Sequence, residues 1–71
     1  MTYQPGDRVR IKAFDMEFDG TVEVGFDLER RGAHGAVVTS PDNPYYPNQG
    51  VMFYGEEIEL LWPASVSRRS T

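Results

Sequence analysis

Apolar and polar residues alternate in several short stretches of this chain, and turn-forming residues separate the stretches. The first stretch, residues 8–13, places Val9, Ile11 and Ala13 at every second position. Side chains of a β-strand point alternately to opposite faces, so this spacing predicts a strand with one buried face. Pro5-Gly6-Asp7 supplies the turn that precedes it.

The next apolar residues follow a different phase. The expected inward positions here are Phe14, Met16 and Phe18, and Asp19-Gly20 interrupts the alternation before a further strand begins. A shift of one residue moves every side chain to the opposite face. We therefore expect a bend or β-bulge between Ala13 and Met16, where the chain passes from one half of a small barrel to the other.

Later segments complete an all-β pattern. Strands are predicted at 21–24, 36–39, 51–54 and 59–62, and a 3₁₀ turn at 55–58 is expected before the last of them. Residues 25–35 mix glycines with charged residues and predict a loop or an irregular hairpin. The expected core positions are the inward residues of these strands: Val9, Ile11, Val22, Val37, Val51, Phe53, Ile58 and Leu60.

The length of the chain allows one domain with a small core. It has 71 residues and no cysteine, so burial and strand pairing must stabilise the fold without disulfides. We expect the domain at residues 1–63 and a flexible, polar tail at 64–71. No apolar run approaches the roughly 20 residues of a membrane span, and the start lacks the features of a signal peptide. We therefore expect a soluble protein in the cytoplasm of a bacterium or of an infected host cell.

The charge balance disfavours generic binding to nucleic acid. Eleven acidic and seven basic residues give a formal net charge of −4, whereas nucleic-acid-binding domains are usually basic. A local basic stripe is still possible, because Arg8, Arg10 and Lys12 share one face of the first predicted strand. The simpler interpretation is that these cations pair across the sheet with carboxylates. The candidate carboxylates are Asp15, Glu17, Glu57 and Glu59.

The sequence offers little for catalysis. His34 is the only histidine, and its place between Gly32 and Gly35 is typical of an exposed loop residue. Asp15, Glu17 and Asp19 alternate and would share a strand face, but an acidic outer face that keeps a small barrel soluble explains them equally well. We predict no catalytic residue, no metal site and no cofactor, and hence no enzymatic activity.

The segment from Pro41 to Gln49 contains two adjacent tyrosines between prolines. Proline limits the freedom of a loop, and tyrosine combines a large apolar ring with a polar tip, a pairing common on binding surfaces. Tyr45 and Tyr46 are therefore candidates for a partner-binding site. The alternative is that they fold back and cover one end of the barrel.

Three segments together resemble the small SH3-like barrels of bacterial and phage proteins, including domains related to the KOW type. Gly6, Asp7, Val9 and Ile11 match the family's first strand, often Gly-Asp-x-Val-x-Val, and residues 55–61 match its closing 3₁₀ turn and strand. A Gly-x-x-Gly-x-Val-Val entry to the middle strand completes a likeness over residues 5–62. The resemblance implies a five-stranded SH3-like barrel. The peptide-binding motif Ala-Leu-Tyr-Asp-Tyr is missing, and the single tryptophan lies near the chain end.

These observations favour a non-enzymatic module, a small adaptor or inhibitor of bacterial or phage type, that binds a larger protein partner. The candidate partner-binding residues are Tyr45, Tyr46 and Trp62. The alternative is a nucleic-acid-associated barrel that uses Arg8, Arg10, Lys12, Arg30 and Arg31. A third hypothesis is a homo-oligomeric structural component joined at barrel edges, although we expect a monomer rather than a homo-oligomer.

Overall fold

Five antiparallel strands form a single sheet. The computed structural model describes residues 2–28 and 33–64. The strands are β1 (Arg8–Ala13), β2 (Met16–Leu28), β3 (Ala33–Thr39), β4 (Val51–Tyr54) and β5 (Ile58–Trp62), with a 3₁₀ turn, η1 (Gly55–Glu57), before the last one. The strand order is β4-β3-β2-β1-β5. The all-β class and the 3₁₀ turn are therefore confirmed.

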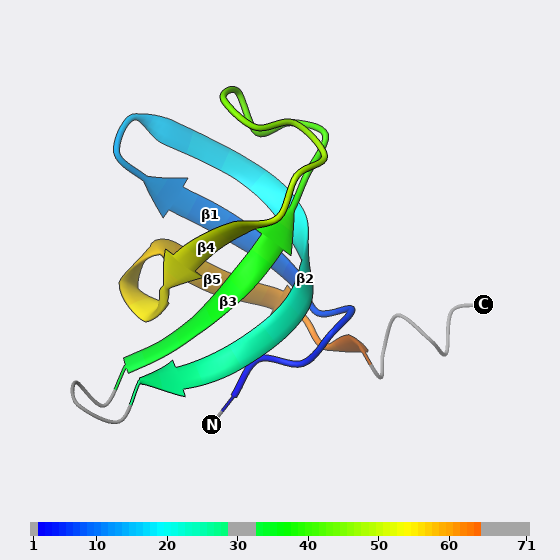
Figure 1. Ribbon diagram of the computed structural model, residues 1–71, viewed down its shortest axis with the longest axis vertical. Coiled ribbons are helices and arrows are strands. Elements are labelled where there is room, and N and C mark those ends of the chain that lie inside the picture. Colours follow the sequence, from blue (N-terminus) through cyan, green and yellow to red (C-terminus); the bar gives the residue numbers. More distant parts are fainter. Residues whose placement is uncertain (1, 29–32, 65–71) are drawn as a thin grey trace.

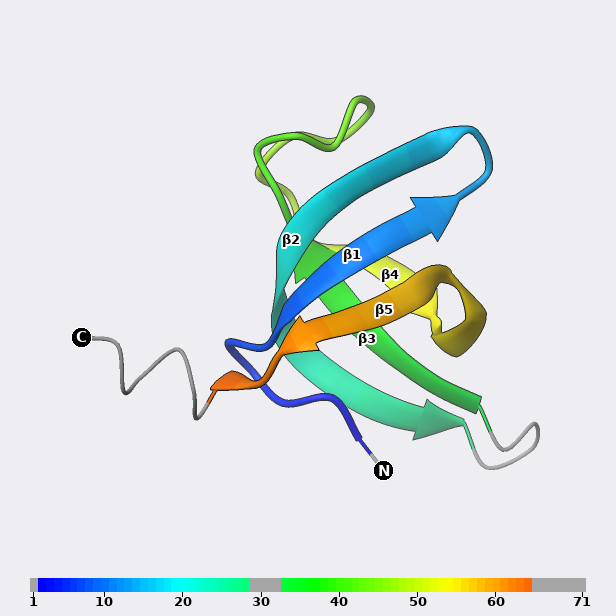
Figure 2. The same ribbon diagram turned by 180° about the vertical axis from the view of Figure 1, so that it is seen from behind.

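The sheet bends around its own core (Figure 1, Figure 2). Figure 2 shows β5, β1 and the first part of β2 in front, with β3 and β4 behind, so the long β2 passes from one side to the other. Its pairing with β3 shifts by one residue between Val22 and Val24, as at a β-bulge, which increases local twist. The two edge strands contribute Phe53 and Ile58 to the same buried cluster. The bend thus lets both ends of one sheet cover one core.

The core confirms most of the predicted strand phase. Val9, Ile11, Val22, Phe53 and Ile58 are buried as expected. The other buried apolar residues are Ala13, Phe18, Ala36 and Val38. The rings of Phe18 and Phe53 meet edge to face, with centroids 6.0 Å apart, and so join β2 to β4 through the core.

One expected core position, Leu60, was wrong, and two others, Val37 and Val51, are only partly buried. Val37 is only partly buried because β3 turns Ala36 and Val38 inward, with Ala36 opposite Phe53 of β4. Three consecutive apolar residues carry no alternation, so the sequence could not select the phase. Val51 is also partly buried and packs against the core, and Leu60 is 45% exposed although Ile58 on the same strand is buried.

The expected bend between Ala13 and Met16 is instead a tight hairpin turn. Ala13 pairs directly with Met16, which leaves Phe14 and Asp15 as the two turn residues. Phe14 has a φ of 56° and is 95% exposed, so the predicted inward position is wrong for this residue. Glycine or asparagine is usual at a positive φ in such a turn, and the phenylalanine therefore gave no turn signal.

Residues 25–35 belong largely to strands rather than to a loop. β2 continues to Leu28 and β3 begins at Ala33, so the expected irregular segment is a hairpin whose residues 29–32 lie outside the described part. The hairpin alternative is therefore confirmed and the loop alternative is not. Gly25 sits in the strand, where the backbone of Tyr3 packs directly against it. Gly20, expected to interrupt the pattern, likewise lies within β2 where it faces Val38.

The start and the end of the described chain meet at a buried carboxylate. The Asp7 side chain is 5% exposed and accepts hydrogen bonds from the backbone N–H of Gln4 at 2.9 Å and of Ala64 at 2.8 Å. Ala64 is therefore tied to the domain, next to the expected boundary at residue 63. The remainder of the predicted tail, residues 65–71, lies outside the described residues.

Candidate functional site

An open groove of about 590 Å³ lies between the β1–β2 hairpin, the β3–β4 loop, strand β4 and η1. In Figure 1 the hairpin and the loop both reach the upper end of the molecule, above β4. We call it the aromatic groove, after the exposed apolar side chains that line it: Phe14, Tyr45, Tyr46, Met52 and Tyr54. Phe53 joins the lining to the core, since it is itself buried.

The backbone of the β3–β4 loop is held by two buried polar side chains. The side-chain oxygen of Asn43, Oδ1, accepts hydrogen bonds from the backbone N–H groups of Tyr45 and Tyr46, both at 3.0 Å. The Ser40 hydroxyl donates to the backbone oxygen of Asp19 in β2 at 2.6 Å, which ties the loop to the sheet. Ser40 and Asn43 are only 2% and 3% exposed. The loop is therefore fixed in shape from beneath.

The same loop leaves its two tyrosine rings at the surface. Tyr45 is 61% exposed and Tyr46 is 54% exposed, so neither is a core residue. The structure thus brings together two of the three residues that the sequence named as partner-binding candidates. A rigid backbone with exposed aromatic rings loses little conformational freedom when it binds, which is the property expected of a recognition surface.

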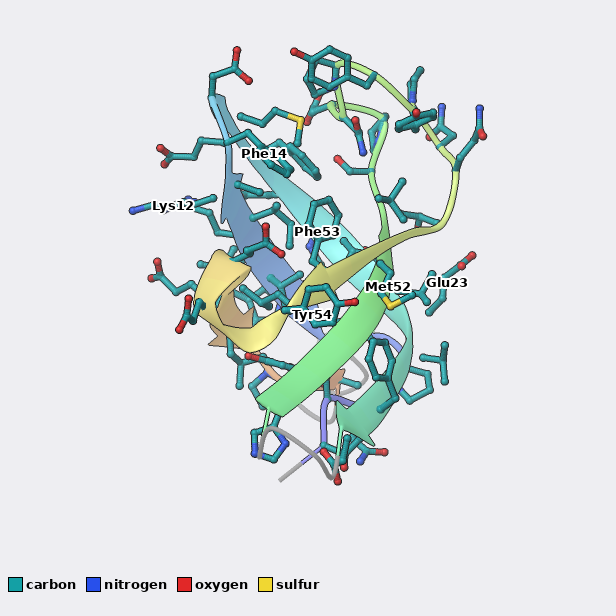
Figure 3. All side chains as sticks on the ribbon, turned by 60° about the vertical axis from the view of Figure 1, so that its left-hand side comes forward. Lys12, Phe14, Glu23, Met52, Phe53 and Tyr54 are labelled. Carbon is teal, nitrogen blue, oxygen red and sulfur yellow. The ribbon has the colours of Figure 1, made fainter. Side chains whose placement is uncertain are left out.

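Sequence analysis missed the other side of the groove. Phe14 was expected inside the barrel, and no role was given to Met52 or Tyr54, which project from β4 (Figure 3). Alternation within residues 51–54 could have identified the latter two, because the assignment of Phe53 to the core places Met52 and Tyr54 on the opposite face. No comparable signal was available for Phe14.

Trp62 lies outside the aromatic groove. It stands on β5 opposite Arg8 of β1, and it is absent from the groove lining. Its neighbours Leu60 and Pro63 line a second, smaller cavity of about 480 Å³ with Tyr3, on the side of the molecule where the described chain begins and ends. The structure therefore separates the third candidate from Tyr45 and Tyr46.

The predicted basic stripe is part of a surface of mixed charge, which we call the charged face: Arg8, Arg10, Lys12, Glu17 and Asp19. The Arg10 guanidinium forms an ion pair with Asp19 at 2.8 Å, and Arg8 donates to the Thr21 hydroxyl at 2.7 Å. Lys12 stands opposite Glu17 in the strand register. The hydrogen bond and charge of Arg10 lower the pKa of Asp19, and Asp19 in turn raises the pKa of Arg10.

Two residues of the nucleic-acid alternative cannot be placed next to the charged face. Arg30 and Arg31 lie outside the described residues. Arg10 also stands opposite Glu59 of β5 in the register, one of the carboxylates named for cross-strand pairing. Arg10 therefore pairs with a carboxylate across the sheet, as predicted. Its ion-pair partner is Asp19, which was not among the predicted carboxylates.

The only histidine lies in a strand and not in a loop. His34 of β3 faces Asp27 of β2, with Nδ1 2.6 Å from a carboxylate oxygen, and Thr2 donates to the other oxygen of Asp27 at 2.8 Å. The hydrogen bond with His34 is the largest cause that lowers the pKa of Asp27, and the hydrogen bond from Thr2 lowers it further. Within residues 2–28 and 33–64, no three histidine, aspartate or glutamate side chains are grouped so that they could hold a metal ion. No helix in the same residues is long and apolar enough to cross a membrane.

Comparison with known proteins gives no family for this chain. No protein-family model matches the sequence, and no curated protein or solved structure matches it either. The function therefore has to be argued from the groove and its surroundings.

Proposed function

We propose that this protein is an SH3-like barrel that acts as a non-enzymatic protein-interaction module and binds a larger protein partner through the aromatic groove. The strand order β4-β3-β2-β1-β5, the bend of β2 and the single core shared by both edge strands support the barrel. The sequence resemblance over residues 5–62 agrees with this arrangement.

The observation that carries the proposal is the exposure of aromatic side chains on a loop whose backbone already has its hydrogen-bond partners within the protein. Asn43 and Ser40 hold the loop through hydrogen bonds, while Tyr45, Tyr46 and Phe14 keep half or more of their surface in contact with water. A small monomer without a partner gains nothing from such a cluster, because clustered exposed apolar surface favours association. Aromatic residues in a shaped cavity are typical of interface hot spots.

The nucleic-acid alternative has weaker support. Of the cations that it requires, Arg10 is ion paired with Asp19 and Arg8 donates to the Thr21 hydroxyl, so a phosphate group would have to compete with Asp19 for Arg10. The aromatic groove itself is lined by Asp15 and Glu57 and by no lysine or arginine. A phosphate backbone would be repelled there.

The experiment compares capture of the native partner by the wild-type protein and by the Tyr45→Ala, Tyr46→Ala double variant. We expect the double substitution to weaken capture by about 2 kcal/mol or more, the level of an interface hot spot, while the Tm stays close to that of the wild type. Trp62→Ala is the matched control, since it removes an exposed aromatic ring outside the groove. Equal capture by the folded double variant, or selective loss in Trp62→Ala, contradicts the proposal.

A further inference from the structure

The aromatic groove runs along the open edge of strand β4. Its lining includes Val51, Met52, Phe53 and Tyr54, which are all four residues of the strand. Successive side chains of a strand point to opposite faces, so a cavity on one face of the sheet would meet only every second residue. A groove that contacts every residue must lie beside the strand. In the strand order β4 is terminal and pairs with β3 alone.

The hydrogen-bonding groups on this edge can be assigned from one contact. The backbone N–H of Tyr54 donates to the Glu57 carboxylate at 3.0 Å, so it points away from β3. In an antiparallel pair, residues alternate between those that bond the neighbouring strand and those that face outward. Two residues earlier, the N–H and C=O of Met52 therefore face the groove. Glu57 occupies the edge at Tyr54, and the edge beside Met52 is open to a ligand.

The charges around the groove select the chemistry of an occupant. Among the residues that the structure describes, its lining contains two carboxylates, Asp15 and Glu57, and no lysine or arginine. Lys12 points away from the groove (Figure 3). A second copy of this chain that docked through its own groove would bring the same carboxylates against each other, and both copies carry a formal charge of −4. A positively charged segment complements them, and its cations can also lie on the faces of the exposed aromatic rings.

We propose that the aromatic groove receives an extended, basic segment of the partner protein, which adds to the sheet as a strand beside β4. The partner backbone hydrogen-bonds to the N–H and C=O of Met52, and its lysine or arginine side chains lie near Asp15, Glu57 and the aromatic rings. Strand addition of this kind takes affinity from main-chain hydrogen bonds and specificity from the side chains beside them. This inference rests on the proposed function and adds the shape and charge of the partner.

The probe is a synthetic peptide, acetyl-Thr-Lys-Val-Lys-Val-Lys-Thr-amide, with glutamate in place of lysine in the control peptide. Amide hydrogen exchange of the full-length wild-type protein is measured by NMR with and without the lysine peptide. The Met52 amide should exchange rapidly in the free protein and become protected at saturation, whereas the amides of Val51 and Phe53, which face β3, should be protected in both states. Binding of the lysine peptide without protection of Met52 overturns the proposal.

Substitution at Met52 separates backbone pairing from side-chain contact. Met52→Pro removes the outward N–H, a change that an edge strand tolerates, whereas Met52→Ala keeps that N–H and removes the side chain. We expect Met52→Pro to weaken binding of the lysine peptide about tenfold relative to Met52→Ala, as for loss of one backbone hydrogen bond. Equal binding by the two variants overturns strand addition. The exchange measurement on the wild type decides the question if the proline variant does not fold.

The two proposals fail in different ways. No binding of the lysine peptide at about 1 mM, or preferential binding of the glutamate peptide or of a proline-rich peptide without N–H groups, overturns the basic strand as occupant. Loss of native-partner capture in the Tyr45→Ala, Tyr46→Ala variant would still support the proposed function in that case. Unchanged capture by that double variant contradicts the proposed function itself.

Discussion

The charged face and the aromatic groove use their side chains in opposite ways. On the charged face, Arg10 pairs with Asp19 and Arg8 bonds Thr21, so the side chains satisfy one another within the sheet. In the groove the backbone of the loop is satisfied by Asn43, and the rings of Tyr45 and Tyr46 are left exposed. The difference identifies the surface that has something to gain from a partner.

Binding would change different interactions on the two surfaces. A ligand on the charged face that engages Arg10 must displace its ion pair with Asp19, and it gains only the difference between the old and the new interaction. A ligand in the groove removes exposed apolar surface from water, which is favourable at about 25 cal/mol per Å². The groove is therefore the surface that we propose for binding, and the charged face is the weaker candidate.

The largest effect on stability should come from the residue that holds the groove in shape. Asn43→Ala removes the acceptor for two backbone N–H groups at a buried site, and we expect it to cost about 1–3 kcal/mol in the free energy of unfolding. Asn43→Asp is the conservative control, because it keeps an acceptor oxygen. Urea denaturation measures both. Unchanged stability in Asn43→Ala would show that Asn43 does not hold the β3–β4 loop in shape.

A smaller effect of opposite sign is expected at the hairpin. Phe14 has a positive φ that costs a residue with a Cβ about 1–3 kcal/mol, and glycine avoids that cost but loses more entropy on folding. Phe14→Gly should therefore raise stability by about 1 kcal/mol while weakening partner binding. Phe14→Ala, which keeps the Cβ, should weaken binding without the gain. Lower stability in the glycine variant than in the alanine variant would show that the turn is not strained.

The smallest effect should lie on the charged face. Because the pKa of Asp19 is lowered in the folded protein, its contribution is present above the ordinary value of 3.8 and is lost as the pH falls through the lowered value. The Tm difference between the wild type and Asp19→Asn should therefore be small near neutral pH, shrink with added salt, and vanish well below pH 3.8. Arg10→Gln should give the same loss. A Tm difference that persists at low pH would show that the ion pair is not its origin.

Sequence reasoning succeeded where alternation and turn residues were unambiguous. The strands at 8–13 and 51–54 have the predicted bounds, and η1 lies within the predicted 3₁₀ turn. It failed where local signals conflicted with packing. Ala36, Val37 and Val38 carry no alternation, Gly25 lies in a strand because the backbone of Tyr3 packs on it, and Phe14 occupies a turn position typical of glycine.

The same reasoning found one side of the candidate site and missed the other. Prolines and adjacent tyrosines were enough to select the β3–β4 loop, but the loop sequence does not reveal that Asn43 is buried beneath it. Trp62 was grouped with the tyrosines as an expected neighbour, and the structure leaves it outside the groove that they line. Distance along the chain carries no information about which turns of a bent sheet meet at one end.

Local chemistry in the sequence determined the all-β class, most of the strand bounds, the acidic balance and the aromatic loop, because alternation, turn propensity and charge are properties of neighbouring residues. Only the tertiary structure decided which surface is open. The bend of β2 brings the β1–β2 hairpin, the β3–β4 loop and the edge of β4 around one groove, and the strand register places Asp19 beside Arg10. Both outcomes depend on contacts between residues far apart in the chain, which no local pattern specifies.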